Sequence, residues 1–205
     1  MVPTRIDGES KDHRFLFAHG AGAPMDTPFM TRIARGLAER GIEVVRFEFP
    51  YMAARRETPP RRRPPDREPA LVATWNEVIE TFRDVRRLVI GGKSMGGRFA
   101  TKVADEARVD GIVCFGYPFH PPGKPSSLRT SHLETLRTPA LFVQGTRDAL
   151  GSRDDVETYA LSKAIRFAWI EDGDHSLKPR AASGRTEKEA LEEAITAAAA
   201  FIVGP

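Results

Sequence analysis

A serine stands at the centre of a Gly-x-Ser-x-Gly pattern formed by Gly92, Ser94 and Gly96. An apolar run at residues 88–91 precedes it, and a segment of helical period follows it directly. Such a strand-turn-helix junction lifts a serine hydroxyl clear of the sheet, and the turn is so tight that only small residues fit two positions before and after the serine. The first amides of the helix, with Met95 N–H in front, would face negative charge developing beside the serine. The pattern predicts a nucleophile elbow.

Two other interpretations of this serine compete with the elbow. Gly-x-Ser-x-Gly arises by chance in glycine-containing turns, but the strand before it and the helix after it favour the elbow. Gly92, Lys93 and Ser94 also spell the last triplet of a phosphate-binding loop. That loop requires a glycine at position 87, where the chain has Arg87, so we reject it. Lys93 itself could polarise a substrate or form a structural ion pair.

A nucleophilic serine needs a base to accept its proton and a third group to orient that base. Asp148 follows an apolar run at 140–145, and His175 follows one at 166–170. Both would stand at the carboxyl ends of strands, where open α/β sheets gather catalytic groups. Asp148 could instead be a turn or helix-capping carboxylate, with Asp155 as the rival acid, and His175 could be a surface histidine. Position and chain order favour a serine, aspartate and histidine triad.

The loop after the first predicted strand carries Gly20 and Gly22 on either side of Ala21. Glycines let a backbone approach a substrate closely, so an N–H of this loop could complete an oxyanion hole with that of Met95. We expect Ala21 to be the donor, with Gly22 as its rival and as a substrate contact. His19 precedes the loop and is expected to be a hydrogen-bonded structural residue rather than a base.

Two further side chains lie near the predicted site. His120 follows the fourth predicted strand and should stand on the rim of the site. There it could contact substrate, or it could be a loop histidine fixed between prolines. Arg98, early in the helix after the elbow, is expected to brace neighbouring loops.

Short β-rich apolar runs alternate with segments of helical period along the chain, which predicts an α/β fold. We expect a mainly parallel sheet of six strands or slightly more, with helices on both faces. Helices are predicted from Pro28 to a stop at Gly41, from near Pro69, directly after Ser94, and from a capping box at Thr186. The predicted strands are 15–18, 44–49, 88–91, 111–116, 140–145 and 166–170.

One stretch of the sequence is rich in proline and arginine. Six arginines and three carboxylates lie between residues 51 and 70, so this stretch carries the whole net charge of +3. Because prolines disfavour helix, residues 55–69 are predicted to form a loop. It would lie at the same edge as the triad, where Arg55 and Arg56 could cover the pocket and attract an anionic substrate, or the loop could simply be solvated. The stretch lacks interleaved aromatics, so no nucleic-acid partner is expected.

The bulk composition bounds the remaining choices. A length of 205 residues with 40% hydrophobic residues suits one domain spanning 1–205. The one cysteine, Cys114, excludes an internal disulfide, and neither a secretory leader nor a membrane span is evident, so we expect a cytoplasmic protein. The predicted chemistry calls for no metal or organic cofactor. The sequence carries no signal for the oligomeric state.

Taken together, blocks across nearly the whole chain resemble the α/β-hydrolase superfamily, and within it the compact bacterial hydrolases related to testis-expressed protein 30. The resemblance implies a minimal hydrolase fold, trimmed at the N-terminal edge of the usual eight-stranded sheet, with the triad on Ser94, Asp148 and His175. Residues 116–140 leave no room for a cap domain. The blocks that carry the resemblance are residues 19–23, 46–52, 91–98, 116–125, 144–148 and 173–176.

These inferences converge on a hydrolase of small-molecule acyl substrates. Ser94 would cleave an ester, thioester or similar acyl bond through a covalent acyl-enzyme. The resemblance implies little about the substrate, and a related animal protein belongs to a chromatin-modifying complex. The alternative function is therefore a non-catalytic protein-interaction module on a hydrolase scaffold.

Overall fold

The computed structural model describes residues 1–57 and 64–204. Within them, the chain forms a seven-stranded sheet in the order β1-β3-β2-β4-β5-β6-β7, parallel throughout except for β1. The predicted mainly parallel sheet is confirmed, with one strand more than the six expected. The strands are β1 (Thr4–Asp7), β2 (His13–Ala18), β3 (Glu43–Phe47), β4 (Arg87–Lys93), β5 (Gly111–Phe115), β6 (Ala140–Gly145) and β7 (Ile165–Ile170).

The strand absent from the prediction is β1, which lies at one edge of the sheet. It pairs antiparallel with β3, so that Asp7 lies opposite Val44. Its one apolar side chain, Ile6, is half exposed, so no alternation of buried residues announces a strand here. Tertiary pairing decides it instead, because the buried guanidinium of Arg46 in β3 lies 2.7 Å from the Asp7 carboxylate.

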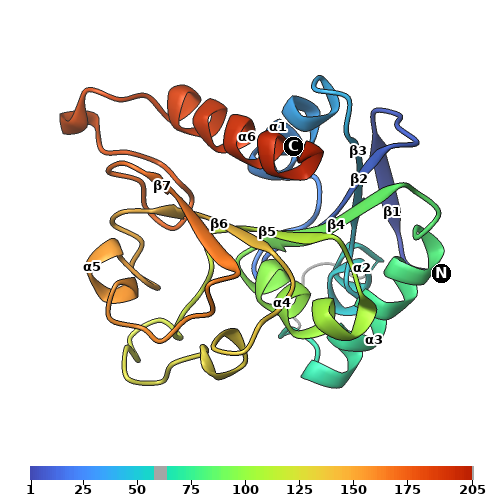
Figure 1. The fold of residues 1–205 in the computed structure, drawn as a ribbon, viewed down its shortest axis with the longest axis horizontal. Helices are drawn as coiled ribbons and strands as arrows, with labels where there is room; N and C mark the ends of the chain where they lie inside the picture. Colours follow the sequence, from blue (N-terminus) through green and yellow to red (C-terminus); the bar gives the residue numbers. More distant parts are fainter. Residues whose placement is uncertain (58–63, 205) are drawn as a thin grey trace.

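Helices cover both faces of the sheet, as predicted (Figure 1). Helices α1 and α6 lie on one face, and α2, α3 and α4 lie on the other. In the described part of the chain, no helix combines the length and apolarity that crossing a membrane requires. The helices are α1 (Pro28–Ala38), α2 (Pro50–Glu57), α3 (Glu68–Thr81), α4 (Met95–Ala107), α5 (Arg153–Val156) and α6 (Glu187–Val203), with short 3-10 turns η1 (Ser131–Leu133) and η2 (Ala181–Ser183).

Local sequence explains where the two helices of the first face begin. The Thr27 hydroxyl accepts from Met30 N before α1, and Thr186 and Glu189 form the predicted capping box at the start of α6. The two helices then pack closely on each other, because a Cβ on Gly36 would lie 2.6 Å from Cδ1 of Ile195. This contact joins elements that are far apart in the sequence.

The strand order creates the crevice in which the site lies. From β2 the chain moves outward to β3, and it then returns to place β4 on the other side of β2. The loops that leave the carboxyl ends of β2 and β4 therefore diverge, which is where open α/β sheets bind ligands. These loops carry Ala21 and Ser94.

The arginine-rich stretch differs from the predicted loop. Residues 55–57 continue α2, and α3 already begins at Glu68, so the expectation of a loop over 55–69 was wrong at both ends. Burial of Tyr51 and Met52 on the α2 side of the sheet favours the helix there. Arg61, Arg62 and Arg63 lie outside the described residues.

Candidate active site

Ser94 occupies a strained turn between β4 and α4. Its backbone has φ 51° and ψ −113°, a conformation that residues other than glycine rarely adopt. The flanking glycines are required, since a Cβ on Gly92 would lie 2.5 Å from the Ala18 oxygen and one on Gly96 would lie 2.6 Å from the same atom. This is the geometry that the elbow pattern predicts.

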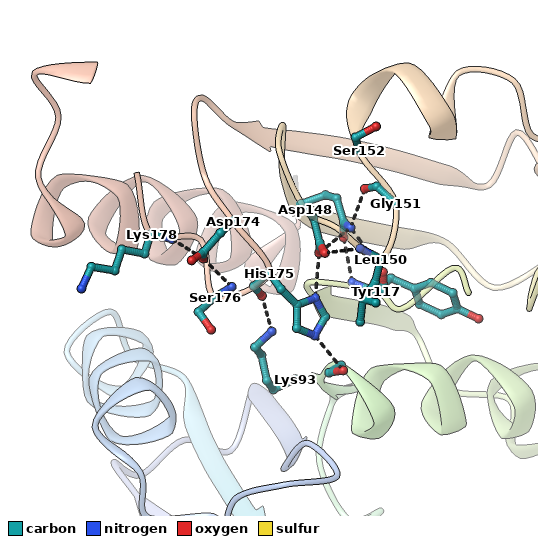
Figure 2. A network of polar contacts seen from close by, with 12 residues as sticks. Lys93, Tyr117, Asp148, Leu150, Gly151, Ser152, Asp174, His175, Ser176 and Lys178 are labelled. Carbon is teal, nitrogen blue, oxygen red and sulfur yellow. Dashed lines mark hydrogen bonds and ion pairs between the residues drawn. The ribbon is translucent and has the colours of Figure 1, made fainter. Parts of the chain in front are cut away.

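The structure brings Ser94, His175 and Asp148 together in one hydrogen-bonded chain. Nε2 of His175 lies 2.9 Å from Ser94 Oγ, and Nδ1 lies 2.8 Å from Asp148 Oδ2. Because a carboxylate accepts, Nδ1–H donates to Asp148 and leaves Nε2 free to accept the serine proton. Figure 2 shows the His175 ring beside Asp148, with Lys93 approaching the histidine backbone. The rival acid, Asp155, instead closes a capping box with Ser152 at the start of α5.

Asp148 is fully buried, and its acceptor oxygens are occupied by three donors. Besides His175, Leu150 N–H donates to Oδ1 at 2.8 Å and the side-chain amide of Gln144 donates to Oδ2 at 2.8 Å. Gln144 is itself fully buried, and its Oε1 accepts from Tyr117 N–H at 2.7 Å. Sequence reasoning missed Gln144 as a site residue, although a polar residue inside an apolar strand was a signal for it.

Two positive-φ residues shape the loop that carries His175, Asp172 at 57° and Leu177 at 65°. Asp174 Oδ1 accepts from the backbone N–H groups of Ser176 and Lys178, which closes a tight turn around the histidine (Figure 2). At the start of the loop, a hydrogen bond from Arg180 lowers the pKa of Asp172 to about 2. The loop is thus fixed at both ends.

Lys93 lies beneath the same loop rather than in an ion pair. Its Nζ donates to the carbonyl oxygen of His175, and in the described residues no carboxylate lies within ion-pair distance of it. The ammonium also lies 5.6 Å from the centre of the Phe29 ring. Burial lowers the pKa of Lys93 to about 8, against the opposing charges of Asp148 and Asp174. Lys93 therefore holds the backbone of the histidine.

The loop after β2 places Ala21 against the serine. His19 is fully buried, and because its Nε2 accepts from Phe49 N–H at 3.1 Å, its Nδ1–H donates to Gly20 O at 2.7 Å. Burial lowers the pKa of His19, which keeps this ring neutral. Tyr51 Oη donates to Ala21 O at 3.0 Å. On the opposite side, Met95 N–H belongs to the first turn of α4 and has no acceptor within the helix.

Two pockets meet at Ser94 and Ala21. The first, called the Arg98 pocket below, has a volume of about 410 Å³. The second, called the Phe29 pocket, has a volume of about 440 Å³ and includes His175. Apart from Ser94 and Ala21, the Arg98 pocket is lined by Pro65, Asp66, Glu68, Leu71, Met95, Arg98, Phe99, Pro118, Pro122, Arg129 and Leu150. The Phe29 pocket is lined by Gly20, Gly22, Ala23, Pro24, Thr27, Phe29, Met30, Lys93, His175 and Ser176.

Of the other residues predicted to contact substrate, one lines a pocket and three do not. Gly22 lines the Phe29 pocket. His120 is buried with Nδ1 3.0 Å from Pro121 O, and it lines neither pocket. The Arg55 guanidinium lies over the Tyr51 ring at 5.1 Å, also outside both linings.

Arg56 does not face the substrate pockets either. Its guanidinium binds the buried carboxylate of Glu48 at 2.6 Å and the Asp26 carboxylate at 2.7 Å. These ion pairs raise the pKa of Arg56 and lower that of Asp26. The expectation that Arg56 contacts substrate was wrong. Arg56 instead links the end of β3 to the loop before α1.

No metal centre can be assembled from the described side chains, which nowhere group three or more histidines, cysteines, aspartates or glutamates around a common point.

Comparisons with known proteins agree with this architecture. The model of the alpha/beta hydrolase domain family matches residues 11–203, so the chain belongs to that family. The predicted superfamily is therefore confirmed.

Solved structures of low sequence identity share the fold. A monoacylglycerol lipase from Paleococcus ferrophilus is similar with a TM-score of 0.74 at 13% identity, over 99% of this chain and 98% of that one. An alpha-beta serine hydrolase homologue from Coxiella burnetii has a TM-score of 0.69 at 20% identity, over 98% and 90%. A serine hydrolase without lid from Xanthomonas campestris has a TM-score of 0.64 at 17% identity, over 100% and 91%. The predicted fold without a cap is confirmed.

Proposed function

We propose that this protein is a serine hydrolase that cleaves an ester, thioester or related acyl bond through an acyl-enzyme on Ser94. The observation that carries the proposal is the hydrogen-bonded chain from Ser94 through His175 to buried Asp148, which opens onto two pockets. Family membership supports hydrolase activity at the level of the family.

The proposed acylation step uses the His175 tautomer that Asp148 sets, with the proton on Nδ1 and Nε2 free to accept. Ser94 Oγ forms a bond to the acyl carbon while its proton passes to Nε2 of His175. The carbonyl oxygen becomes an oxyanion between the N–H groups of Met95 and Ala21, each contributing about 3 kcal/mol at the transition state. When the intermediate collapses, the bond to the leaving oxygen or sulfur breaks and that atom takes the proton from Nε2.

Deacylation repeats the sequence with water. The water gives a proton to Nε2 of His175 as its oxygen bonds to the acyl carbon, and collapse returns the proton to Ser94 Oγ. Throughout, the Asp148 carboxylate stabilises the imidazolium and retains the tautomer. Its burial strengthens this interaction, because the local dielectric constant is low.

Finer assignments belong to the same proposal. We propose a relationship to the hydrolases related to testis-expressed protein 30, supported by the sequence blocks at 116–125 and 144–148. We also propose a single domain that acts on small-molecule acyl substrates in the cytoplasm. Buried Cys114, the one cysteine of the chain, is in keeping with a reducing compartment.

The experiment that tests the proposal treats the protein with a fluorophosphonate probe and with short-chain 4-nitrophenyl esters and thioesters. We expect covalent labelling, located on the Ser94 peptide by mass spectrometry, and turnover of at least one substrate. Ser94→Ala is the control and should lose both while keeping the circular dichroism spectrum of the wild type. If the folded wild type neither labels nor turns over any substrate, the hydrolase proposal fails and the interaction module takes its place.

A further inference from the structure

The two pockets at Ser94 are not equivalent, because only one of them contains the general acid. His175 lines the Phe29 pocket and is absent from the lining of the Arg98 pocket. In acyl transfer, the histidine must reach the leaving atom to protonate it. In the proposed reaction the leaving group would therefore lie in the Phe29 pocket, and the acyl chain would extend from Ser94 into the Arg98 pocket.

The Arg98 pocket contains two arginines. Arg98 is one helical turn beyond Ser94 on α4, where its N–H donates to Ser94 O at 3.0 Å. Arg129 enters from the segment before η1, with its backbone anchored by Phe119 O at 2.7 Å and by the Tyr117 hydroxyl at 3.0 Å. Both arginine residues are partly buried.

Neither guanidinium has a carboxylate partner in the described part of the chain, where the ion pairs within 4.0 Å involve other residues. Arg98 lies instead over the Phe99 ring at 4.5 Å. Burial lowers the pKa of Arg129, and the charge of Arg98 lowers it further. The two cations line the same pocket, and an anion bound there would offset their charges.

Two carboxylates line the same pocket, but both are engaged elsewhere. Asp66 Oδ2 accepts from Tyr51 N–H at 2.9 Å. Glu68 pairs with Lys102 at 2.6 Å, and that hydrogen bond lowers its pKa, with a smaller contribution from the charge of Arg98. Much of the remaining lining is apolar, with Leu71 and Leu150 among its members. Such a wall suits methylene groups.

We propose that Arg98 and Arg129 bind an anionic group at the far end of the acyl chain, so that the preferred substrates are esters or thioesters of dicarboxylic acids. A free carboxylate is the anion that most simply terminates an acyl chain, and arginine binds it with two parallel hydrogen bonds. The inference rests on the proposed function, since it assigns a substrate class to the same site. It makes Arg98 and Arg129 specificity-determining residues.

The test compares two pairs of esters, and the members of each pair differ by one carboxylate. Mono(4-nitrophenyl) adipate carries the anion on the acyl chain, and 4-nitrophenyl hexanoate is its neutral counterpart of equal chain length. A second pair, 4-acetoxybenzoate and phenyl acetate, differs by an anion on the leaving group. Rates in Ser94→Ala supply the background. We expect the adipate to exceed the hexanoate by about 10-fold in kcat/KM, as a hydrogen-bonded charge pair would provide, and 4-acetoxybenzoate to gain nothing over phenyl acetate.

Variants locate the effect. Arg98→Gln with Arg129→Gln should remove the preference by raising KM for the adipate with little change in kcat, because a remote contact binds substrate and transition state alike. The ratio of the adipate to the hexanoate in kcat/KM is the readout for this variant, and its circular dichroism spectrum, compared with that of the wild type, reports that it folds. Arg98→Lys with Arg129→Lys should restore part of the preference. Arg86→Gln, an arginine with an 83% exposed side chain, is the matched control and should change nothing.

The outcomes separate this inference from the proposed function. If the fluorophosphonate labels Ser94 but neither the adipate nor the hexanoate is hydrolysed, the anion site is wrong; if the wild type takes no label and turns over no ester at all, the hydrolase proposal itself has failed. If the hexanoate is hydrolysed as well as the adipate, or if the double glutamine variant retains the preference, the anion site is wrong while the hydrolase stands. A gain for 4-acetoxybenzoate instead of the adipate would overturn the assignment of the two pockets.

Discussion

The buried amide of Gln144 and the carboxylate of Asp148 lie four residues apart and are joined by a hydrogen bond of 2.8 Å. The bond ends on Oδ2, the same oxygen that receives Nδ1–H of His175. Tyr117 N–H holds the Gln144 amide in turn. Gln144 therefore fixes the orientation of the Asp148 carboxylate group. Gln144 is thus a positioning residue that acts through Asp148.

Replacing this amide should reduce turnover more than binding. Gln144→Met keeps the volume but removes the hydrogen bonds, so we expect kcat to fall by about 10-fold or more with KM little changed. Gln144→Glu places a second carboxylate beside Asp148, which raises the pKa of the pair. The acid limb of its pH–rate profile should therefore move to higher pH. A packing role alone would leave that limb in place.

The two candidate acids can be separated by paired variants. Asp148→Asn should preserve the fold but lower kcat by about four orders of magnitude, because the amide favours the wrong histidine tautomer. Asp155→Asn should leave kcat unchanged and cost about 1 kcal/mol in the free energy of unfolding, since it weakens the α5 capping box. Steady-state kinetics and urea unfolding give both numbers. Near-normal activity of Asp148→Asn would contradict the proposed triad.

Lys93 should impose a pH dependence on stability. Its folded-state pKa of about 8 lies below its ordinary value of 10.5, so between these values the folded protein binds fewer protons than the unfolded chain. The contribution of Lys93 to the free energy of unfolding therefore rises with pH between these two pKa values. Urea unfolding should show the wild type gaining about 2 kcal/mol over Lys93→Met between neutral pH and about pH 10. A pH-independent difference would mean that Lys93 titrates normally.

The elbow glycines should tolerate no side chain. In Gly96→Ala the new Cβ would lie within 2.7 Å of the Ala18 and His19 carbonyl oxygens, which are backbone atoms with little room to move. We expect a loss of about 2 kcal/mol in the free energy of unfolding, and lower turnover because the β2 loop must shift.

Gly22→Ala is the matched control for the elbow. Apart from its two chain neighbours, no residue has an atom within 4 Å of the added Cβ, and the amide is retained. Thermal unfolding should show it within about 0.5 kcal/mol of the wild type. Equal effects of the two alanine variants would argue against a steric role for Gly96.

Much of the fold follows from local patterns. Six strands were predictable because each is a short, β-rich apolar run, and α1, α3, α4 and α6 were predictable because their buried residues recur with helical period. The edge strand was not, because Ile6 alone among its residues is apolar and its pairing with β3 arises from tertiary contact. The helix at Arg55 and Arg56 was not predictable either, because the neighbouring prolines indicated a loop. Burial of Tyr51 stabilises α2 in the folded protein.

The site was predictable where backbone geometry restricts residue type. Ser94 belongs to a turn that only one local pattern allows, and the ends of strands position Asp148 and His175. The contacts of a side chain such as that of Arg98 were not predictable, because the direction in which a side chain points depends on the packed structure. For this reason Arg98 was expected to brace loops, whereas the structure places it in the pocket beside Ser94.

The close packing of Gly36 against Ile195 has a consequence for heat inactivation. Helix α1 begins just after the loop that carries Ala21, and α6 follows the loop that carries His175, so one helix pair anchors both loops. We expect both loops to be released only when α1 and α6 separate. Ester turnover and near-ultraviolet circular dichroism should consequently be lost along one melting curve, with no partly active species between the native and the unfolded chain.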